Sequence, residues 1–363
     1  MTDRQPTRRA VLAAAASVAA VASAAAVLPR AAFGQAAKPR LKVGQIGTTH
    51  AHADKLGVYR RSTDYEVVGV VEPDDARWDR AKDSPAYRDL PRLTEEQLFG
   101  TPGLAAVTVE THVRDLVPTG TRCLKAGFPI HLDKPAGGNL ADLRALLDVA
   151  TEKKLLVQLG YMLRASPATA LIKRLLKDGT LGDVFEVHGV MSKVVAPAER
   201  KRLAEFPGGM LFELGCHLVD QVVDYLGKPD RVVPLSTKSK LGEADGLLDN
   251  GLAAFLYPRA TATVRSTALE VDGGKRRHLT ICGTNGTLEL LPLEPPQVKL
   301  TLAADGGGFR KGTQAVPMPK YERFVGDAAD MAAILRGEKA NEYPPAHELV
   351  VHECVLRAAG VVG

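Results

Sequence analysis

The chain of 363 residues is long enough for two domains, and its 45% hydrophobic and 25% charged residues are typical of a soluble globular protein. The formal charge is +5, but the first 36 residues carry four arginines against one aspartate, which leaves a charge near +2 on the rest. So small a positive charge excludes the strongly basic surface by which proteins bind nucleic acids or anionic membranes.

Residues 1–36 are typical of a signal peptide that directs export through the twin-arginine (Tat) translocon. Arg8 and Arg9 precede an uncharged, Ala- and Val-rich stretch that runs to Leu28, and small residues near Gly34 offer a cleavage site. A transmembrane anchor is the alternative, but the stretch is shorter than about 20 residues and mostly alanine. We therefore predict a periplasmic or secreted protein. Because Tat substrates fold before export, a redox cofactor acquired in the cytoplasm is also expected.

Residues 37–160 are expected to form a doubly wound parallel sheet, because short apolar runs alternate with helical stretches. Thr94-Glu95-Glu96-Gln97 fits a capping box at a helix start. The expected strands are residues 41–46, 66–71, 105–109, 129–132 and 155–159. One helix is expected to end near residue 61, and two more are expected at residues 116–126 and 139–153.

Residues 161–363 favour an α+β domain with a large, open, mostly antiparallel sheet and a few helices on one face. Ser166-Pro167 starts a helix, and Asn285-Gly286 is a hairpin turn because both residues tolerate positive φ. The expected strands are 184–195, 231–239, 252–257, 260–269, 278–282 and 287–291. A loop is expected at 305–308, and two closing helices at 321–336 and 346–361 could pack back on the first domain.

The turn after the first strand predicts a dinucleotide site, although its glycine pattern is incomplete. Gly47 supplies the first glycine, but Thr49 and His52 occupy the places of the second and third. Glu72 ends the second strand, where an acid holds the ribose hydroxyls, and with its acidic neighbours it favours NAD over NADP. The alternative is that Glu72 only begins a solvated helix. The candidate nucleotide contacts in these turns are Gly47, Thr48, Thr49, His50 and Glu72.

No metal site is predicted. The four cysteines (Cys123, Cys216, Cys282 and Cys354) are widely spaced and include no C-x-x-C pair, which indicates free thiols. His50 and His52 could act as ligands, but in this turn they are more typical of helix-start residues that face solvent or a phosphate.

Two further segments carry candidate catalytic residues. Asp133-Lys134-Pro135 follows the fourth strand, at the edge where such sheets bind ligands, and burial is expected to lower the pKa of Lys134. Read alone, it could be a surface turn. On a helix, Glu213, His217 and Asp220 would share one face, so that Glu213 could orient His217 and raise its basicity. A metal site or an internally bonded structural pair are the alternatives for this face.

Together these segments resemble the Gfo/Idh/MocA family of oxidoreductases, and the resemblance extends from Val43 to Gly360. The family's E-K-P tripeptide is matched by Asp133-Lys134-Pro135, and its G-G-G-x-L-x-D-x-G-x-H-x-x-D segment by residues 208–220. Gly160-Tyr161-Met162-Leu163-Arg164, followed by Pro167, resembles the segment that joins the family's two domains.

The resemblance implies an N-terminal Rossmann domain, a second domain whose open sheet forms dimers or tetramers, and hydride transfer between a sugar or polyol hydroxyl and a nicotinamide. Lys134 would hold the reacting hydroxyl and His217 would take its proton, with Glu213 beside them. Thr111, Asp133 and Lys134 would join the nucleotide contacts, and Tyr161, Arg164 and Asp220 would line the substrate pocket.

The departures from the family pattern leave three functions open. Asp133 stands where the family has Glu, and Glu213 stands where it has Asp. Thr49 and His52 stand in place of two glycines of the nucleotide-binding pattern. An exported oxidoreductase with tightly held NAD is the first hypothesis. The others are a glycoside hydrolase that works by transient oxidation and elimination, and a non-catalytic periplasmic sugar-binding protein.

Overall fold

The computed structural model describes residues 38–206, 208–242 and 244–361. The predicted signal peptide lies outside the described residues, so Tat export stays a prediction. Within the described part of the chain, no helix is both long enough and apolar enough to cross a membrane. Cys123, Cys216, Cys282 and Cys354 are free thiols.

The first domain is built on a six-stranded parallel sheet of order β3-β2-β1-β4-β5-β6, as the alternating pattern predicted. Its strands are β1 (Leu41–Ile46), β2 (Tyr65–Val71), β3 (Arg92–Leu93), β4 (Leu104–Val109), β5 (Ile130–Leu132) and β6 (Val157–Leu159). The strand order reverses between β1 and β4, and open α/β sheets bind their ligands at the carboxyl edge of such a switch point.

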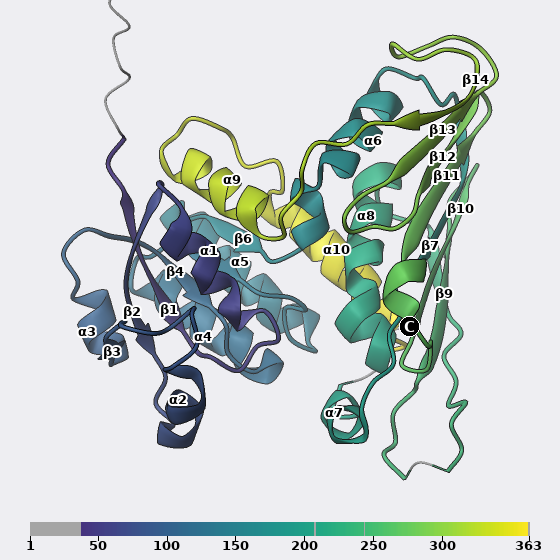
Figure 1. Ribbon diagram of the computed structural model, residues 1–363. Coiled ribbons are helices and arrows are strands. Elements are labelled where there is room, and N and C mark those ends of the chain that lie inside the picture. Colours follow the sequence, from purple (N-terminus) through teal and green to yellow (C-terminus); the bar gives the residue numbers. More distant parts are fainter. Residues whose placement is uncertain (1–37, 207, 243, 362–363) are drawn as a thin grey trace, which may run out of the picture. The chain divides into compact units, whose positions relative to one another are not determined.

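Helices cover both faces of the parallel sheet (Figure 1). They are η1 (Ala53–Lys55), α1 (Leu56–Arg61), α2 (Asp75–Ala81), α3 (Glu95–Phe99), α4 (Val113–Lys125) and α5 (Leu140–Lys153). The predicted capping box at α3 is confirmed, because Thr94 accepts from the amide of Gln97 and the Gln97 side chain accepts from the amide of Thr94.

The second domain contains an eight-stranded sheet of order β14-β13-β12-β11-β7-β10-β9-β8, in which only β7 and β10 pair in parallel. This confirms the mostly antiparallel prediction. The strands are β7 (Val184–Val190), β8 (Arg231–Pro234), β9 (Asn250–Leu256), β10 (Thr261–Thr267), β11 (His278–Gly283), β12 (Gly286–Leu290), β13 (Val298–Leu302) and β14 (Gly312–Val316). The last two strands were not predicted from the sequence.

One face of the large sheet packs against helices and the other lies open (Figure 1). Every second residue of β9 and β10 is buried, which is the pattern of a sheet with one covered face. The helices of this domain are η2 (Met162–Ala165), α6 (Pro167–Lys177), α7 (Pro197–Leu203), the π-helix η3 (Leu211–Gly215), α8 (Cys216–Leu226) and η4 (Gly273–Arg276).

The two C-terminal helices return to the first domain. In α9 (Val325–Leu335), Ala328, Met331 and Ala332 belong to the buried cluster that covers the β1–β2 side of the parallel sheet. The last helix, α10 (Pro345–Ala358), packs against both α5 and α8. As a result, Pro39–Gly363 form one compact unit.

A buried ion cluster ties α8 and α10 to the segment that joins the domains. The Arg164 guanidinium donates to Asp220 at 2.6 Å and to Glu348 at 2.6 Å, and both carboxylates are fully buried. Its plane also lies over the Tyr343 ring, with 3.9 Å to the ring centre. Because Arg164 and Asp220 satisfy each other here, the geometry favours a structural role over the predicted substrate contact for both residues.

Replacing Arg164 with alanine is expected to lower the free energy of unfolding by about 3–5 kcal/mol, because two buried carboxylates lose their cation. The matched control is Arg259→Ala, since Arg259 pairs with Asp183 on the surface and such pairs contribute about 0–1 kcal/mol. Denaturant unfolding of both variants provides the comparison. Equal losses in the two variants would show that the buried cluster does not stabilise the junction.

Candidate active site

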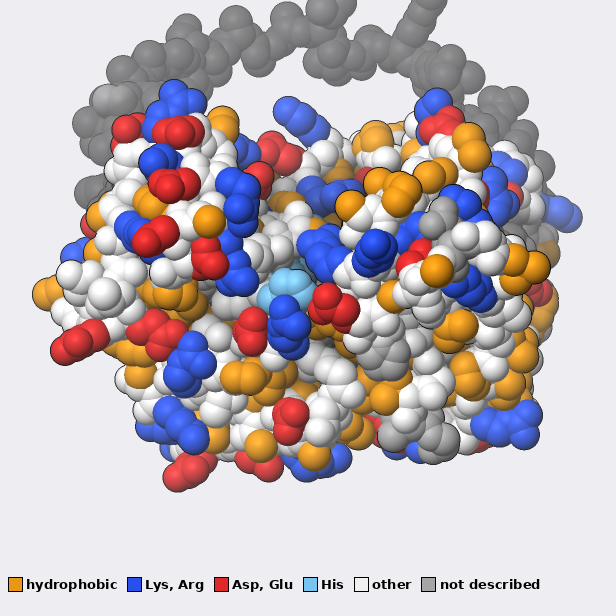
Figure 2. Space-filling model, turned by 90° about the horizontal axis from the view of Figure 1, so that it is seen from below, with side chains coloured by type: hydrophobic (Ala, Val, Ile, Leu, Met, Phe, Trp, Pro, Cys, Tyr) orange, Lys and Arg blue, Asp and Glu red, His pale blue; other side chains and the backbone are white. Residues whose placement is uncertain are grey.

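The predicted site residues gather at the carboxyl edge of the parallel sheet. Gly47 directly follows β1, Thr111 lies just beyond β4, and Asp133-Lys134 follow β5. The π-helix η3 and the start of α8 supply Glu213 and His217 from the second domain. Seen from this side, the molecule has a hollow with a histidine, flanked by Lys and Arg side chains (Figure 2).

A cavity of about 690 Å³ lies beside the ends of β1, β2 and β4. Its volume is within the range of roughly 300–1,000 Å³ usual for ligand sites. Four of the predicted nucleotide contacts line it, namely Gly47, Thr49, Glu72 and Thr111. Three arginines also line the cavity, and each is paired with a carboxylate: Arg77 with Glu72, Arg92 with Asp75 and Arg122 with Glu95.

Gly47 has the left-handed conformation that the first glycine of a dinucleotide turn needs. Its φ is +90°, and a Cβ there would lie 2.7 Å from Thr111 Cα and 2.8 Å from the Glu110 carbonyl. No side chain fits between the ends of β1 and β4 at this point. The cavity and this close backbone approach together fit a nucleotide.

Glu72 lies at the end of β2 and is almost fully buried. Its Oε2 accepts from the amide of Thr48 at 3.1 Å and from the Thr48 hydroxyl at 2.8 Å. Its Oε1 accepts from the amide of Asp74 at 3.2 Å. The carboxylate is therefore fixed at the cavity wall, where an acid contacts a ribose, instead of lying in a solvated helix start.

The turn after β1 differs from the expectation for its two histidines. The amides of Thr49 and His50 donate to the Glu110 carbonyl, which draws the turn inward. His50 is buried, and its Nε2 lies 3.0 Å from the Lys134 carbonyl oxygen. The His52 Nδ1 lies 3.2 Å from the Asp133 carboxylate. The prediction that these side chains face solvent or a phosphate is therefore wrong for His50, whereas His52 stays partly exposed.

A buried charged cluster lies beneath the turn. Lys55 contacts the Asp133 carboxylate, lies 3.0 Å from Glu110 and donates to His131 at 2.8 Å. Burial raises the pKa of Glu110 well above its usual range, and the nearby Lys55 opposes this shift. Burial would also raise the pKa of Asp133, but the contacts of His50 and Lys55 outweigh it and hold that pKa well below its usual range.

The ion pair between Lys55 and Asp133 makes this cluster unfavourable for a metal ion. Ligand atoms of His50, His52 and Asp133 lie within 4.8 Å of one another, a spacing that a metal could use. However, Asp133 already pairs with the Lys55 ammonium, whose positive charge would repel a divalent cation at this place. The absence of a metal stays a prediction. Asp133 supports the site from beneath through its bonds to Lys55 and the Lys134 amide, and its nucleotide contact stays a prediction.

Lys134 is buried at the boundary of the two domains. Its Nζ donates to the Glu213 carbonyl oxygen at 2.6 Å and lies 3.9 Å from Glu213 Oε1. Burial would lower the pKa of Lys134, but the nearby Cys216, Glu213 and Asp133 outweigh burial and raise it. The expectation of a lowered pKa was wrong, so Lys134 is a permanently charged hydrogen-bond donor.

The expected pairing of Glu213 with His217 is also corrected by the structure. Residues 211–215 form a π-helix, whose wider turn rotates Glu213 away from its α-helical place one turn before His217. Glu213 faces Lys134 instead, and Asp220 faces Arg164. Burial, reinforced by Lys134 and His52, lowers the pKa of His217 well below its usual range, so its basicity falls instead of rising.

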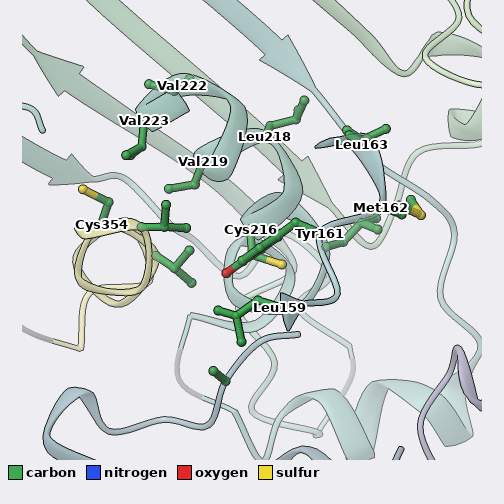
Figure 3. Close-up of a cluster of buried hydrophobic side chains, with 14 of the residues drawn as sticks. Leu159, Tyr161, Met162, Leu163, Cys216, Leu218, Val219, Val222, Val223 and Cys354 are labelled. Carbon is green, nitrogen blue, oxygen red and sulfur yellow. The ribbon is translucent and has the colours of Figure 1, made fainter. Parts of the chain in front are cut away.

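Three polar groups close to Lys134 have buried atoms with no hydrogen-bond partner in the described part of the chain. They are both ring nitrogens of His217, the Tyr161 hydroxyl and Oε2 of Glu213. The Tyr161 and His217 rings meet edge to face with their centres 6.1 Å apart, and Tyr161 lies beside Cys216 in the hydrophobic cluster of Figure 3. Unpaired buried polar atoms are costly, and a polyhydroxylated ligand would supply their partners.

Sequence reasoning missed Lys55 and Glu110, and it did not predict the contact of His52 with Asp133. Glu110 directly follows the apolar strand β4 at the carboxyl edge of the sheet, which is the same signal that identified Lys134 after β5. Lys55 and His52 carried no such signal, because only the inward turn after β1 brings them to Asp133.

Two family models match consecutive parts of the chain. Residues 41–161 match "Oxidoreductase family, NAD-binding Rossmann fold", and residues 169–289 match "GFO/IDH/MocA C-terminal domain". The two matched regions correspond to the parallel sheet and to most of the large mixed sheet.

Individual proteins agree with these matches. The trans-1,2-dihydrobenzene-1,2-diol dehydrogenase of Sus scrofa is 24% identical over 63% of this chain and 67% of its own. The inositol 2-dehydrogenase 1 of Saccharopolyspora erythraea is 30% identical over 41% of this chain and 45% of its own. The crystal structure of the aldose-aldose oxidoreductase from Caulobacter crescentus complexed with glycerol has a TM-score of 0.74, 18% identity, and coverage of 89% of this chain and 98% of that one. The chain therefore belongs to the GFO/IDH/MocA family of NAD-binding oxidoreductases.

Proposed function

We propose that this protein is an exported enzyme that transfers a hydride between a hydroxyl of a sugar or polyol and a tightly held NAD. The observation that carries the proposal is the convergence of the Lys134 ammonium with the unpartnered groups of His217, Tyr161 and Glu213, next to a cavity that fits a nucleotide. The predicted Tat signal supports export of the folded, loaded protein to the periplasm.

Gly47, Thr49, Glu72 and Thr111 would hold the nucleotide at the ends of β1, β2 and β4. The nicotinamide, when bound, supplies the acceptor for the hydride of the substrate. The fixed carboxylate of Glu72 is the group that favours NAD, because it would repel a phosphate on the adenosine ribose.

The chain's own residues handle the substrate hydroxyl. The charged Lys134 donates a hydrogen bond to the hydroxyl oxygen, which stabilises the negative charge that develops as its proton leaves. His217 is neutral at pH 7 because its pKa is lowered, so that a ring nitrogen accepts this proton as a general base.

A substrate with several hydroxyls suits the remaining groups. The Tyr161 hydroxyl and Oε2 of Glu213 would each find a partner in hydroxyls next to the reacting one. The names of the related proteins refer to a diol, an inositol and an aldose, which support this substrate class.

The hollow beside Lys134 measures about 30 Å³ and is closed in part by Arg202 and Phe206. This volume is far below the roughly 300 Å³ at which ligand pockets begin. We therefore propose that α7 and Phe206 move aside when the nicotinamide and the substrate enter.

The open face of the large sheet completes the proposal, because the helices of this domain pack against the other face (Figure 1). This face is expected to join copies of the chain in a homodimer or homotetramer, which light scattering would measure.

The first experiment denatures freshly purified protein and assays the supernatant for nicotinamide nucleotide. Stoichiometric NAD, followed by reduction of that NAD when polyols are added, is expected. Cleavage of a glycoside without net redox change would favour the hydrolase instead. A protein that is empty and binds neither NAD nor NADP would contradict the proposal and favour a sugar-binding protein.

Replacing Glu72 with alanine is expected to weaken NAD binding about tenfold or more, because hydrogen bonds to charged groups contribute roughly 1.5–3 kcal/mol. Binding of NADP should improve relative to NAD, since the repelling carboxylate is gone and Arg77 remains. Isothermal titration of both nucleotides into the emptied protein measures this ratio. Asp79→Ala, at an exposed site on α2, is the control. An unchanged NAD-to-NADP ratio in Glu72→Ala would remove the ribose role.

A further inference from the structure

His52 stands where a dinucleotide turn has its third glycine, and its side chain lies between Asp133 and His217. Its Nδ1 is 3.2 Å from Asp133 Oδ1, and its ring centre is 6.1 Å from that of His217. The His52 side chain is 14% exposed, whereas His217 is only 1% exposed. His52 is thus the member of this histidine pair that reaches towards solvent.

The contact with Asp133 fixes which nitrogen of His52 carries the proton. Asp133 is ionised and has no proton to give, so a neutral His52 must donate from Nδ1. Its Nε2 then holds a free lone pair. An aspartate that orients a histidine in this way is the arrangement that serves general bases in hydrolytic triads.

The oxidation of a buried hydroxyl leaves a proton that must reach water. With a nicotinamide bound, the C–H bond would give its hydrogen and both its electrons to that cofactor as a hydride, and the O–H bond would give its proton to His217. The active site regenerates only when His217 loses that proton, and the residue itself is shielded from solvent. The His52 ring is close enough to receive the proton through one bridging water or hydroxyl.

We propose that His52, oriented by Asp133, relays the proton from His217 to solvent during turnover. This inference rests on the proposed function. It assigns a role to His52, which otherwise only replaces the third glycine of the dinucleotide-binding motif.

The charged groups around His52 suit a relay that does not retain its proton. The Asp133 and Glu213 carboxylates favour the charged form of the His52 ring. The cations Lys55 and Lys134 and the histidines His131 and His217 oppose it. Burial is the largest influence and lowers the pKa of His52 to about 4, so a proton received at neutral pH passes on to water.

The kinetic test uses the NAD-loaded full chain with myo-inositol and D-glucose as probe alcohols. In His52→Gln, the amide can still bond to Asp133 but cannot carry a proton. We expect first-turnover NAD reduction within about twofold of wild type, but proton release to a pH indicator slowed about tenfold or more. Added imidazole should restore the release. His188→Gln, the same exchange on β7, should change neither rate.

The outcomes separate the relay from the function it rests on. If wild type reduces NAD and His52→Gln releases its proton equally fast, the relay is wrong. If reduction and release fall together and imidazole restores neither, His52 is only structural. If wild type reduces no NAD with any polyol, the proposed function fails and the relay with it.

A second measurement needs no turnover. Histidine side chains of ¹⁵N-labelled protein report protonation and tautomer by NMR, and comparison with His52→Gln assigns the His52 signal. A neutral ring with the proton on Nδ1 at pH 7 is expected. A charged ring, or one with the proton on Nε2, would overturn the proposal.

Discussion

Lys134→Ala is expected to lower kcat/KM by about 10²- to 10³-fold, the cost of removing one donor from a developing oxyanion. The reason is the charge of the buried Lys134 ammonium, whose raised pKa keeps it a hydrogen-bond donor to the substrate oxygen. NAD binding should change little, because the cavity that fits the nucleotide is lined from β1, β2 and β4.

Steady-state kinetics and nucleotide titration of the same preparation test this prediction together. Lys299→Ala, which removes an exposed lysine on β13, controls for the loss of a positive charge. Lys134→Arg should recover only part of the activity, since a planar guanidinium places its donors differently from a compact ammonium. Full activity in Lys134→Ala would remove Lys134 from the chemistry.

His217→Ala is expected to lower kcat by about 10²- to 10⁴-fold, the usual contribution of general acid–base catalysis. KM should change much less, because the base acts on the proton while Tyr161 and Glu213 contact the other hydroxyls. Comparison of kcat with KM distinguishes this outcome from a loss of binding. A rise in KM with kcat unchanged would make His217 a binding residue instead.

The same assignment has a consequence for pH dependence. A general base is active when unprotonated, and the pKa of His217 lies well below the ordinary value of 6.5. Wild-type kcat/KM should therefore stay level as the pH falls through 6.5 and decline only in more acidic solution. A decline centred at 6.5 would contradict the buried, neutral state of His217.

The architecture could be predicted because short, continuous apolar runs indicate strands that are buried on both faces of a sheet. The parallel sheet followed from short apolar runs between helices, and the capping box at Thr94 came from side-chain chemistry alone. The strands β13 and β14 were missed because each has only five residues and the two flank a glycine-rich loop at the edge of the sheet.

The site was predicted only in part, because residue types reveal chemistry but not register. Lys134 and His217 lie together, as the motifs indicated, whereas the π-helix at 211–215 turned Glu213 towards Lys134. Nothing in the sequence marks that wider turn. The turn at residues 48–52 bends inward because the backbone amides of Thr49 and His50 donate hydrogen bonds to the Glu110 carbonyl. Local sequence does not determine these hydrogen bonds either.

Transfer of deuterium from substrate to nucleotide tests the central claim most directly. The NAD-loaded protein is mixed with a polyol labelled with deuterium at its carbinol carbons, and the nucleotide is recovered and examined by mass spectrometry. The account predicts that reduced nicotinamide carries one deuterium and that Lys134→Ala and His217→Ala abolish the transfer. Oxidised, unlabelled nucleotide in wild type with every polyol tried would contradict hydride transfer by this site.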